Sequence, residues 1–477
     1  MKQLYIFFFM ALSCFLGNAQ LTQVLDINDG SGNSSPTNLT VYNGQLYFSA
    51  DDQNGSNSPG GIDVGREVWV TDGTGAGTSL FFDVRTGSSN SSPFAFFELG
   101  GTLYFSANDG GGSRIWETDG TSGGTSNTNN GFSNFNPRVI GGKAYMVATT
   151  LGNAFYEFDG TTFQEVPDNG TGVAVPLGGE FIEFDANTIL LYMDYSIDEP
   201  TIGRELYKYD IPTQRYTLIR DVDMGTGDSS ISNFTKIGST VYFEADNALW
   251  QTDGDESGTG TILVGVADTA GISNVSNFFA WNGNLYFEGD DGNGDQLWVY
   301  NPNLDTVTNL SNISGTNVNH DPSDYAALNG FIYYRAKDAN DSDSHLFRTD
   351  GTTVEQLDNT IKDIDEVTVF NGILYFEGDD NTTGNELYSL DPSTLSIQSV
   401  NLNNTVNIYP NPSKDVINVT MTRSIDFNYS IYDVNGRNVL QGTLLNNRIN
   451  HNLDSGMYFL NLQSQDGGTI TKKIIVE

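Results

Sequence analysis

Carboxylate and amide side chains gather in short loops of this chain, where they have the types and spacing of calcium ligands. The candidate ligands are Asp290, Asp291, Asn293 and Asp295 in one loop and Asp338, Asn340 and Asp343 in another. Calcium binding needs several oxygen ligands on a short flexible turn. Asp and Asn also favour tight turns and keep a protein surface soluble. The loops therefore fit either calcium sites or solvated turns. Calcium is the one cofactor that the sequence suggests.

Side chains for covalent or metal-assisted catalysis are scarce. The histidines His320, His345 and His451 lack the spacing of metal ligands, and Cys14 is the only cysteine. We expect both His320, in a loop, and His345, in a strand, to lie at the surface or at a sheet edge. Paired carboxylates would suffice for glycoside hydrolysis, but the sequence does not show which of them pair. We therefore expect a protein that is not an enzyme, with a polysaccharide-degrading lyase or glycosidase as the alternative.

The candidate loops belong to a phrase that the chain repeats eight times between residues 41 and 391. Each repeat has an apolar run, a loop rich in Asp, Asn and Gly, and a second run around a Trp, Tyr or Phe. The first runs centre on Tyr47, Tyr104, Tyr145, Tyr192, Tyr242, Tyr286, Tyr333 and Tyr375. A period of about 45 residues is typical of β-propeller blades.

The local sequence favours strands and hairpins in every repeat. The runs alternate apolar and polar residues, are rich in Tyr, Phe, Val and Thr, and end at Gly or Asp. Pairs such as Asn282 with Gly283 favour tight hairpin turns. We therefore predict an all-β fold, a seven- or eight-bladed β-propeller followed by a small C-terminal β-sandwich. Residues 21–26 resemble the strand that follows the Asp-Gly turn of later repeats, so we expect them to complete the last blade.

Charge and apolar content limit the partners. The net charge of −39 lies entirely before residue 403, because the segment 403–477 holds six basic and six acidic side chains. A field of this sign repels nucleic acid and anionic membranes, so we expect no nucleic-acid partner. Residues 1–19 contain Lys2, an apolar stretch and small residues before Gln20, as in a secretory signal peptide. We expect no transmembrane helix in the mature chain, since no other stretch is long and apolar enough.

Near residue 403 the repeats end and a different set of motifs begins. Its marked positions are Tyr409, Pro410, Asn411, Pro412, Gly436, Arg437, Gly456, Tyr458, Lys472 and Lys473. These motifs resemble the type A C-terminal sorting domain of the type IX secretion system of Bacteroidetes. The resemblance implies that the export machinery is a partner, and that the body is released or attached at the outer-membrane surface. We expect a signal peptide at 1–19, a propeller at 20–402 and a sorting domain at 403–477.

The repeats resemble the ELWxTDGT repeats of secreted bacterial proteins. Residues 67–74 match best, and residues 115–121 and 346–352 match less closely. The resemblance implies a propeller and no particular reaction. With the acidic loops, it favours a secreted or cell-surface binding or adhesion module whose ligand is a glycan or an extracellular protein. A structural component of the cell surface or matrix is a further alternative.

Overall fold

The computed structural model of the chain describes residues 21–131, 136–148, 154–169, 174–175, 180–195, 202–262, 271–313, 319–339, 342–395, 406–421, 427–434, 436–444, 448–464 and 469–477. The predicted signal peptide and Asn340 lie outside these residues. Two compact units are present, one spanning Asn18–Pro392 and one containing Ser393–Glu477. Within the described part of the chain, no helix has the length and apolar character needed to cross a membrane.

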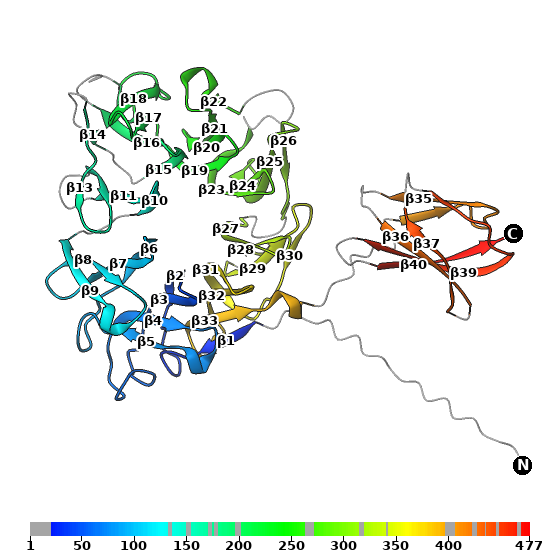
Figure 1. Cartoon of the computed structure of the whole chain (residues 1–477), viewed down its shortest axis with the longest axis horizontal. Helices are drawn as coiled ribbons and strands as arrows, with labels where there is room; N and C mark the ends of the chain where they lie inside the picture. Colours follow the sequence, from blue (N-terminus) through cyan, green and yellow to red (C-terminus); the bar gives the residue numbers. More distant parts are fainter. Residues whose placement is uncertain are drawn as a thin grey trace, which may run out of the picture. The chain divides into compact units, whose positions relative to one another are not determined.

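Eight antiparallel sheets surround a common centre in the first unit, and we number them as blades 1 to 8 (Figure 1). Blade 1 comprises β2 (Thr37–Tyr42), β3 (Gln45–Asp51), β4 (Arg66–Thr71) and β5 (Ser79–Phe82), and blade 2 comprises β6 (Phe94–Leu99), β7 (Thr102–Asn108), β8 (Ser113–Thr118) and β9 (Ser126–Gly131). Blade 3 comprises β10 (Arg138–Ile140), β11 (Lys143–Ala148), β12 (Ala154–Phe158) and β13 (Phe163–Glu165). Blade 4 comprises β14 (Ala174–Val175), β15 (Phe181–Asp185), β16 (Thr188–Tyr195), β17 (Glu205–Asp210) and β18 (Arg215–Arg220).

The second half of the ring repeats this arrangement. Blade 5 comprises β19 (Ser232–Ile237), β20 (Thr240–Ala245), β21 (Ala248–Thr252) and β22 (Gly260–Thr261), and blade 6 comprises β23 (Ser273–Trp281), β24 (Asn284–Asp290), β25 (Asp295–Asn301) and β26 (Thr306–Asn309). Blade 7 comprises β27 (Ser323–Leu328), β28 (Phe331–Lys337), β29 (Ser344–Thr349) and β30 (Val354–Gln356). Blade 8 comprises β31 (Lys362–Phe370), β32 (Ile373–Asp379), β33 (Asn385–Leu390) and, from the other end of the chain, β1 (Thr22–Leu25). The all-β propeller prediction is confirmed, with eight blades among the described residues.

Short 3-10 helices and the first strands complete the pattern. The helices are η1 (Gly75–Gly77), η2 (Ser122–Gly124), η3 (Glu256–Gly258) and η5 (Pro392–Thr394). The first three follow the Asp-Gly turn after the third strand of their blade. The first strands of the blades, such as β2, β19, β23, β27 and β31, lie nearest the centre of the ring (Figure 1). Residues on these strands and on their hairpin partners are therefore the ones that can face a ligand at the centre.

The N-terminal strand closes the ring, as residues 21–26 predicted. β1 pairs antiparallel with β33, with Thr22 opposite Ser389 and Gln23 opposite Tyr388. Blade 8 is thereby built from both ends of the propeller sequence. The pairing gives β33 a partner on each side, as the third strand has in the other blades, and joins the two ends of the ring.

Neighbouring blades pack through the repeated aromatic and Asp-Gly positions. Tyr47, Val68 and Val70 of blade 1 share one apolar cluster with Phe105 and Trp116 of blade 2. The glycine of the Asp-Gly turn lies against the central tyrosine of the preceding blade, as for Gly73 with Tyr375, Gly120 with Tyr47, Gly160 with Tyr104 and Gly351 with Tyr286. All four glycines have positive φ, which favours glycine. At Gly73 and Gly351 an added Cβ would also lie only 2.3 and 2.7 Å from the tyrosine hydroxyl, so there the ring is a second reason for glycine.

The C-terminal unit consists of two small sheets around one core. One sheet has the order β34 (Val406–Tyr409), β35 (Val416–Met421), β38 (Arg448–Asn450), and the other has the order β37 (Asn438–Thr443), β36 (Phe427–Asp433), β39 (Gly456–Ser464), β40 (Thr469–Val476). Ile417 and Ile449 of the first sheet pack with Ile431, Leu460 and Ile474 of the second. The predicted sandwich is thus present in the described residues.

Candidate functional site

A polar pocket of about 380 Å³ lies between blades 5 and 6. Its lining comes from the inner strands β19 and β23, from β24, from the start of β25, and from the turn between β20 and β21. The lining residues are Ser232, Asn233, Glu244, Asn247, Asn274, Val275, Ser276, Glu288 and Asp295. Eight of these nine side chains are polar, three of them are carboxylates, and none is basic. The volume lies in the range of small-ligand sites.

The short turn of blade 5 helps to form this pocket. Only Asp246 and Asn247 separate β20 from β21, whereas residues 52–65 separate the corresponding strands β3 and β4 of blade 1. Both turn residues have positive φ, 52° and 62°, a conformation that Asp and Asn tolerate better than other non-glycine residues. The backbone N–H of Asn247 donates to Oε1 of Glu244 at 2.9 Å. The turn therefore holds the Glu244 carboxylate in the pocket wall.

The hydroxyl groups that line the pocket already donate to its carboxylates. Ser232 Oγ donates to Oε2 of Glu244 at 2.7 Å, and Ser276 Oγ donates to Oε2 of Glu288 at 2.9 Å. Asn277 Nδ2, on the same inner strand, donates to that oxygen of Glu288 at 2.6 Å. These bonds orient both carboxylates and use the two hydroxyl donors of the lining.

A second carboxylate group adjoins the pocket. Oxygens of Glu288, Asp295 and Asp321 all lie within 4.8 Å of one another, so these residues could hold a cation. Burial raises the pKa of Glu288 and of Asp295, and the neighbouring carboxylates raise both further. Lys337 forms an ion pair with Asp321, and its charge partly offsets the raised pKa of Asp295. One lysine faces three carboxylates, so the group carries excess negative charge.

His320 holds this carboxylate group in place from behind. Its backbone N–H donates to the Asp295 carbonyl at 2.6 Å, and its own carbonyl accepts from Lys337 N at 2.7 Å. Its ring is fully buried, with Nδ1 2.6 Å from the Lys337 carbonyl and Nε2 3.1 Å from the Tyr334 hydroxyl. Burial lowers the pKa of His320 to about 4, so the ring is neutral near pH 7. A surface or edge position was expected for His320, and its full burial corrects that expectation. Its backbone bonds tie Asp295 and Lys337 to the segment that carries Asp321.

The pocket lies in the charged half of the ring. One position on the second strand of each blade can be compared around the ring. It pairs with the third-strand residue that comes just before the repeated aromatic. This position is uncharged in blades 1–4 and charged in blades 5–8: Ser49, Ser106, Val147 and Tyr192, then Glu244, Glu288, Arg335 and Glu377. Sequence reasoning missed Glu244, Glu288 and Asp321. Aligning the repeats by their central tyrosines would have singled out the first two, because Glu replaces Ser two residues after the tyrosine.

Arg335 bridges two further carboxylates in blades 7 and 8. Its guanidinium lies 3.0 Å from Asp324 Oδ2 and 3.3 Å from Asp365 Oδ2, and its Nε donates to Ser323 Oγ at 2.6 Å. Burial raises the pKa of Asp324, and the hydrogen bond and charge of Asp365 raise it further. Acidic groups on the first strands of blades 7 and 8 thus meet a basic group on the second strand of blade 7.

In the two predicted calcium loops, most of the carboxylates already have partners within the protein. The first loop, in blade 6, bonds mainly to itself. Asp290 Oδ1 accepts from the N–H groups of Gly292 and Gly294, at 2.7 and 2.9 Å. Asp291 Oδ1 accepts from both nitrogens of Asn293. Asp295 alone joins the carboxylate group with Glu288 and Asp321.

In the loop of blade 7, one carboxylate forms an ion pair. Asp343 lies 3.8 Å from Lys362, and Asp338 also has an interaction partner. Calcium at either loop stays a prediction.

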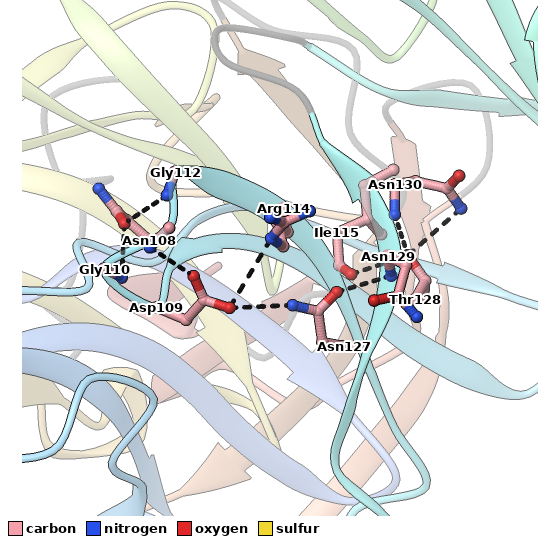
Figure 2. Close-up of polar contacts among 11 residues, drawn as sticks. Asn108, Asp109, Gly110, Gly112, Arg114, Ile115, Asn127, Thr128, Asn129 and Asn130 are labelled. Atoms are coloured by element: carbon pink, nitrogen blue, oxygen red, sulfur yellow. Dashed lines mark hydrogen bonds and ion pairs between the residues drawn. The ribbon is translucent and has the colours of Figure 1, made fainter.

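The acidic loop of blade 2 shows how such carboxylates serve their own hairpin. Asp109 lies between Arg114 and Asn127 (Figure 2), 3.7 Å from Arg114 Nε and 3.1 Å from Asn127 Nδ2. Asn108 Oδ1 accepts from the N–H groups of Gly110 and Gly112 in the same turn. This loop is an internally bonded turn rather than an open ligand set.

Buried glutamates elsewhere hold the connections between blades. Glu67 is fully buried and accepts from Val84 N at 2.8 Å, Ser91 N at 3.1 Å and Ser91 Oγ at 2.6 Å. Glu205 and Glu386 occupy the same position in blades 4 and 8. Burial raises the pKa of Glu67, Glu205 and Glu386 to about 7, and the hydrogen bonds offset this only in part. These three residues occupy the Glu position of the repeated phrase. The glutamate at this position therefore holds the connection between neighbouring blades.

His345 occupies the same position in blade 7, which corrects an expectation. It was expected at the surface or at an edge, yet its side chain is only 3% exposed. Its Nδ1 lies 2.9 Å from the Ile361 carbonyl, in the connection to blade 8. His345 therefore replaces the glutamate and holds the connection in its place.

In the C-terminal unit, the marked residues hold turns and strand ends. Asn411 donates to the Lys473 carbonyl at 3.0 Å and accepts from Ile475 N at 2.8 Å. Arg437 pairs with Asp433 at 3.1 Å beside the turn at Gly436, and the Tyr458 hydroxyl donates to the Asp454 carbonyl at 2.9 Å.

The other marked positions lie in or beside strands of the same unit. Tyr409 ends β34 and is 51% exposed. It precedes Pro410, and Pro412 follows Asn411. Gly456 begins β39, and Lys472 lies in β40 beside Lys473.

Comparison with known families identifies the C-terminal unit. Residues 407–477 match the family model described as a secretion system C-terminal sorting domain. The match supports the type IX sorting domain inferred from the motifs. The chain therefore carries a signal for export to the cell surface or the extracellular space. No curated protein matches the chain at a significant level.

Solved structures that resemble the chain contain propellers and include enzymes. The oligogalacturonate lyase from Vibrio parahaemolyticus is 13% identical, with a TM-score of 0.44 over 76% of this chain and 98% of that one. The β-propeller domain of the Trilobed protease from Pyrococcus furiosus is 14% identical, with a TM-score of 0.40 over 69% and 99%. A puromycin hydrolase is 11% identical, with a TM-score of 0.41 over 76% of this chain and 61% of its own length.

These structures correct one expectation. The chain was expected not to be an enzyme because its sequence has no catalytic signature. Its structural neighbours include a hydrolase and a lyase at low identity, so a propeller of this kind gives no ground for that exclusion. The similarities are too low to assign any of their activities.

Proposed function

We propose that this exported propeller binds a glycan in the pocket between blades 5 and 6. The observation that carries the proposal is the lining of the pocket, where hydroxyl, amide and carboxylate groups surround about 380 Å³. Sugars present many hydroxyl groups, and carboxylate and amide oxygens accept hydrogen bonds from them. The preformed hydrogen bonds at Glu244 and Glu288 keep these acceptors oriented before a ligand arrives.

The sorting domain supports a ligand from outside the cell. The chain carries a sorting domain at residues 407–477, so its propeller is expected to meet extracellular or surface polymers. The described lining has no aromatic side chain, and the repeated aromatic residues, such as Trp69 and Trp116, lie in the cores between blades. Recognition would therefore rest on hydrogen bonds rather than on stacking of sugar rings.

Glycoside hydrolysis is a second candidate, favoured by the carboxylate group beside the pocket. Oxygens of Glu288, Asp295 and Asp321 lie within 4.8 Å of one another. Retaining glycosidases use two carboxyl groups about 5 Å apart, one as acid and base and one as nucleophile. The raised pKa of Glu288 suits a carboxyl that must donate a proton. In this reading Glu288 is the acid and Asp295 the nucleophile.

Affinity gel electrophoresis separates the two candidates. The chain 21–477 would be run through gels that contain neutral, amine-bearing or acidic polysaccharides, and the polymers would be assayed afterwards for shortening. Retardation without shortening supports binding, and shortening that stops in Glu288→Gln supports hydrolysis. Migration unchanged by every polymer would contradict the glycan proposal and favour an extracellular protein as the ligand.

A further inference from the structure

The described pocket lacks a basic group to balance its carboxylates. Glu244, Glu288 and Asp295 line it, Asp321 lies beside Glu288 and Asp295, and no Lys, Arg or His is among the lining residues. The nearby Lys337 is committed to Asp321 by an ion pair. Partly buried like charges at this spacing repel one another, and an incoming cation relieves that repulsion.

The hydrogen bonds in the pocket point to the same kind of ligand. The hydroxyls of Ser232 and Ser276 donate hydrogen bonds to Glu244 and Glu288. Asn233 Nδ2 donates to Ser232 Oγ at 2.8 Å, and Asn233 Oδ1 accepts from Asn277 N at 3.1 Å. These three donors are therefore occupied, and the other side-chain donors of the lining are the amides of Asn247 and Asn274. A ligand that meets the three carboxylates has to bring donors of its own, and an ammonium group brings three together with a positive charge.

We infer that the pocket selects a saccharide with a free, protonated amino group over neutral and acidic saccharides. This inference rests on the proposed glycan binding and adds the chemical class of the ligand. The amine would sit between Glu244 and Glu288, with Asp295 close by, and the hydroxyls of the sugar would meet Asn247 and Asn274 at the rim. An N-acetylated sugar loses the charge and two of the three donors, and an acidic sugar adds repulsion.

A matched pair of oligosaccharides tests the inference. The chain 21–477 would be titrated calorimetrically with a β-1,4-linked glucosamine pentamer and with its fully N-acetylated counterpart, at a pH at which the amines are charged. We expect the amine form to bind about tenfold or more tightly, which corresponds to about 1.4 kcal/mol. Equal binding of both pentamers would overturn the inference and leave the glycan proposal intact. Binding of neither would contradict the glycan proposal itself.

Charge-matched variants separate the pocket from the general negative charge of the chain. Glu244→Gln and Glu288→Gln should each remove most of the preference for the amine form. Glu98→Gln makes the same charge change at an exposed position on β6 in blade 2, so it should keep the preference. A preference that survives in both pocket variants would overturn the inference. Unchanged melting temperatures of the three variants show that the fold is retained.

Calcium provides the competing occupant of the same carboxylates. Calcium chloride would be titrated alone and then together with the amine pentamer. Weak or absent calcium binding at the pocket supports the inference. Tight calcium binding that displaces the amine pentamer and is lost in Glu288→Gln would overturn it, because the pocket would then be a metal site.

Discussion

Ser34 Oγ donates a 2.6 Å hydrogen bond to Oε2 of Glu386, although 352 residues separate the two along the chain. The same carboxylate accepts from Ile27 N at 2.9 Å and from Ser34 N at 3.1 Å. Glu386 therefore holds the connection between β1 and blade 1, directly beside the pairing of β1 with β33. Strand pairing and a buried carboxylate together join the two ends of the propeller.

Removing this carboxylate should destabilise the ring. In Glu386→Ala the buried N–H groups of Ile27 and Asn28 lose the carboxylate that accepts from them, so we expect the free energy of unfolding to fall by about 3 kcal/mol. Ser389→Ala removes an exposed hydrogen bond to the Thr22 carbonyl and should change it by less than about 0.5 kcal/mol. Denaturant unfolding of the chain 21–477 measures both. Equal effects of the two changes would show that the buried carboxylate does not contribute to closure.

The buried glutamates predict an unusual pH dependence. Burial raises the pKa of Glu67, Glu205 and Glu386 from 4.5 to about 7, so the folded chain binds these protons more tightly than the unfolded chain. Their stabilising contribution is complete below pH 4.5 and is lost as the pH rises through 7. The melting temperature should therefore fall across this window. Glu67→Gln should show a shallower fall, whereas the exposed control Glu98→Gln should keep the slope; equal slopes in all three would contradict the assignment.

The contact between Gly73 and Tyr375 predicts a specific cost for a methyl group. A Cβ at Gly73 would lie 2.3 Å from the Tyr375 hydroxyl, and the residue has a φ of +99°. Gly100 also has positive φ, but its Cβ would meet no atom within 4 Å. We expect Gly100→Ala to cost about 1 kcal/mol and Gly73→Ala about 1–3 kcal/mol more.

A double variant tests that contact directly. Tyr375→Phe removes the hydroxyl, so adding it to Gly73→Ala should recover part of the lost stability. Thermal unfolding of the four variants of this cycle measures the coupling. Additive effects of the two substitutions would show that the blades do not meet at these residues.

Much of the fold could be predicted from the sequence because the determining signals are local. The Asp-Gly turns, the alternating runs and the repeat period lie within each blade, and the resemblance of residues 21–26 to a blade strand predicted the closing pair. The role of Glu386 could not be predicted, since its partners are more than 350 residues away. His345 was misjudged although its contact is nearer, because the connection at Ile361 that holds it lies 16 residues further along the chain, beyond its own hairpin.

The candidate site was harder to predict than the fold. The sequence pointed to Asp290 and Asp291, which are used by their own turn. The pocket instead depends on the unusually short turn at Asp246 and Asn247 and on Glu244 and Glu288 in neighbouring blades. Those two residues come together only because consecutive blades stand side by side, a relationship that no single loop contains.

Removing a side chain that bonds to the last strand of the sorting domain should reduce export. Asn411 bonds both to the Lys473 carbonyl and to Ile475 N, so Asn411→Ala should lower the amount of chain that reaches the surface or the medium by several fold. Deletion of residues 407–477 should abolish export. Asn461→Ala, which removes one exposed side-chain bond to Thr471, should export normally. Immunoblots of periplasmic, surface and medium fractions measure all three, and export of the deleted chain would contradict the role of this domain.

The most direct test of the central claim compares glycan binding by the intact pocket with binding by a pocket in which the Glu244 and Glu288 carboxylates are removed. The polysaccharide that most retards the chain 21–477 would be titrated with the native chain and with the double variant Glu244→Gln, Glu288→Gln. The account predicts that the dissociation constant rises at least about tenfold in the double variant, with an unchanged melting temperature. An unchanged dissociation constant would place the ligand elsewhere on the propeller and contradict the assignment of the pocket.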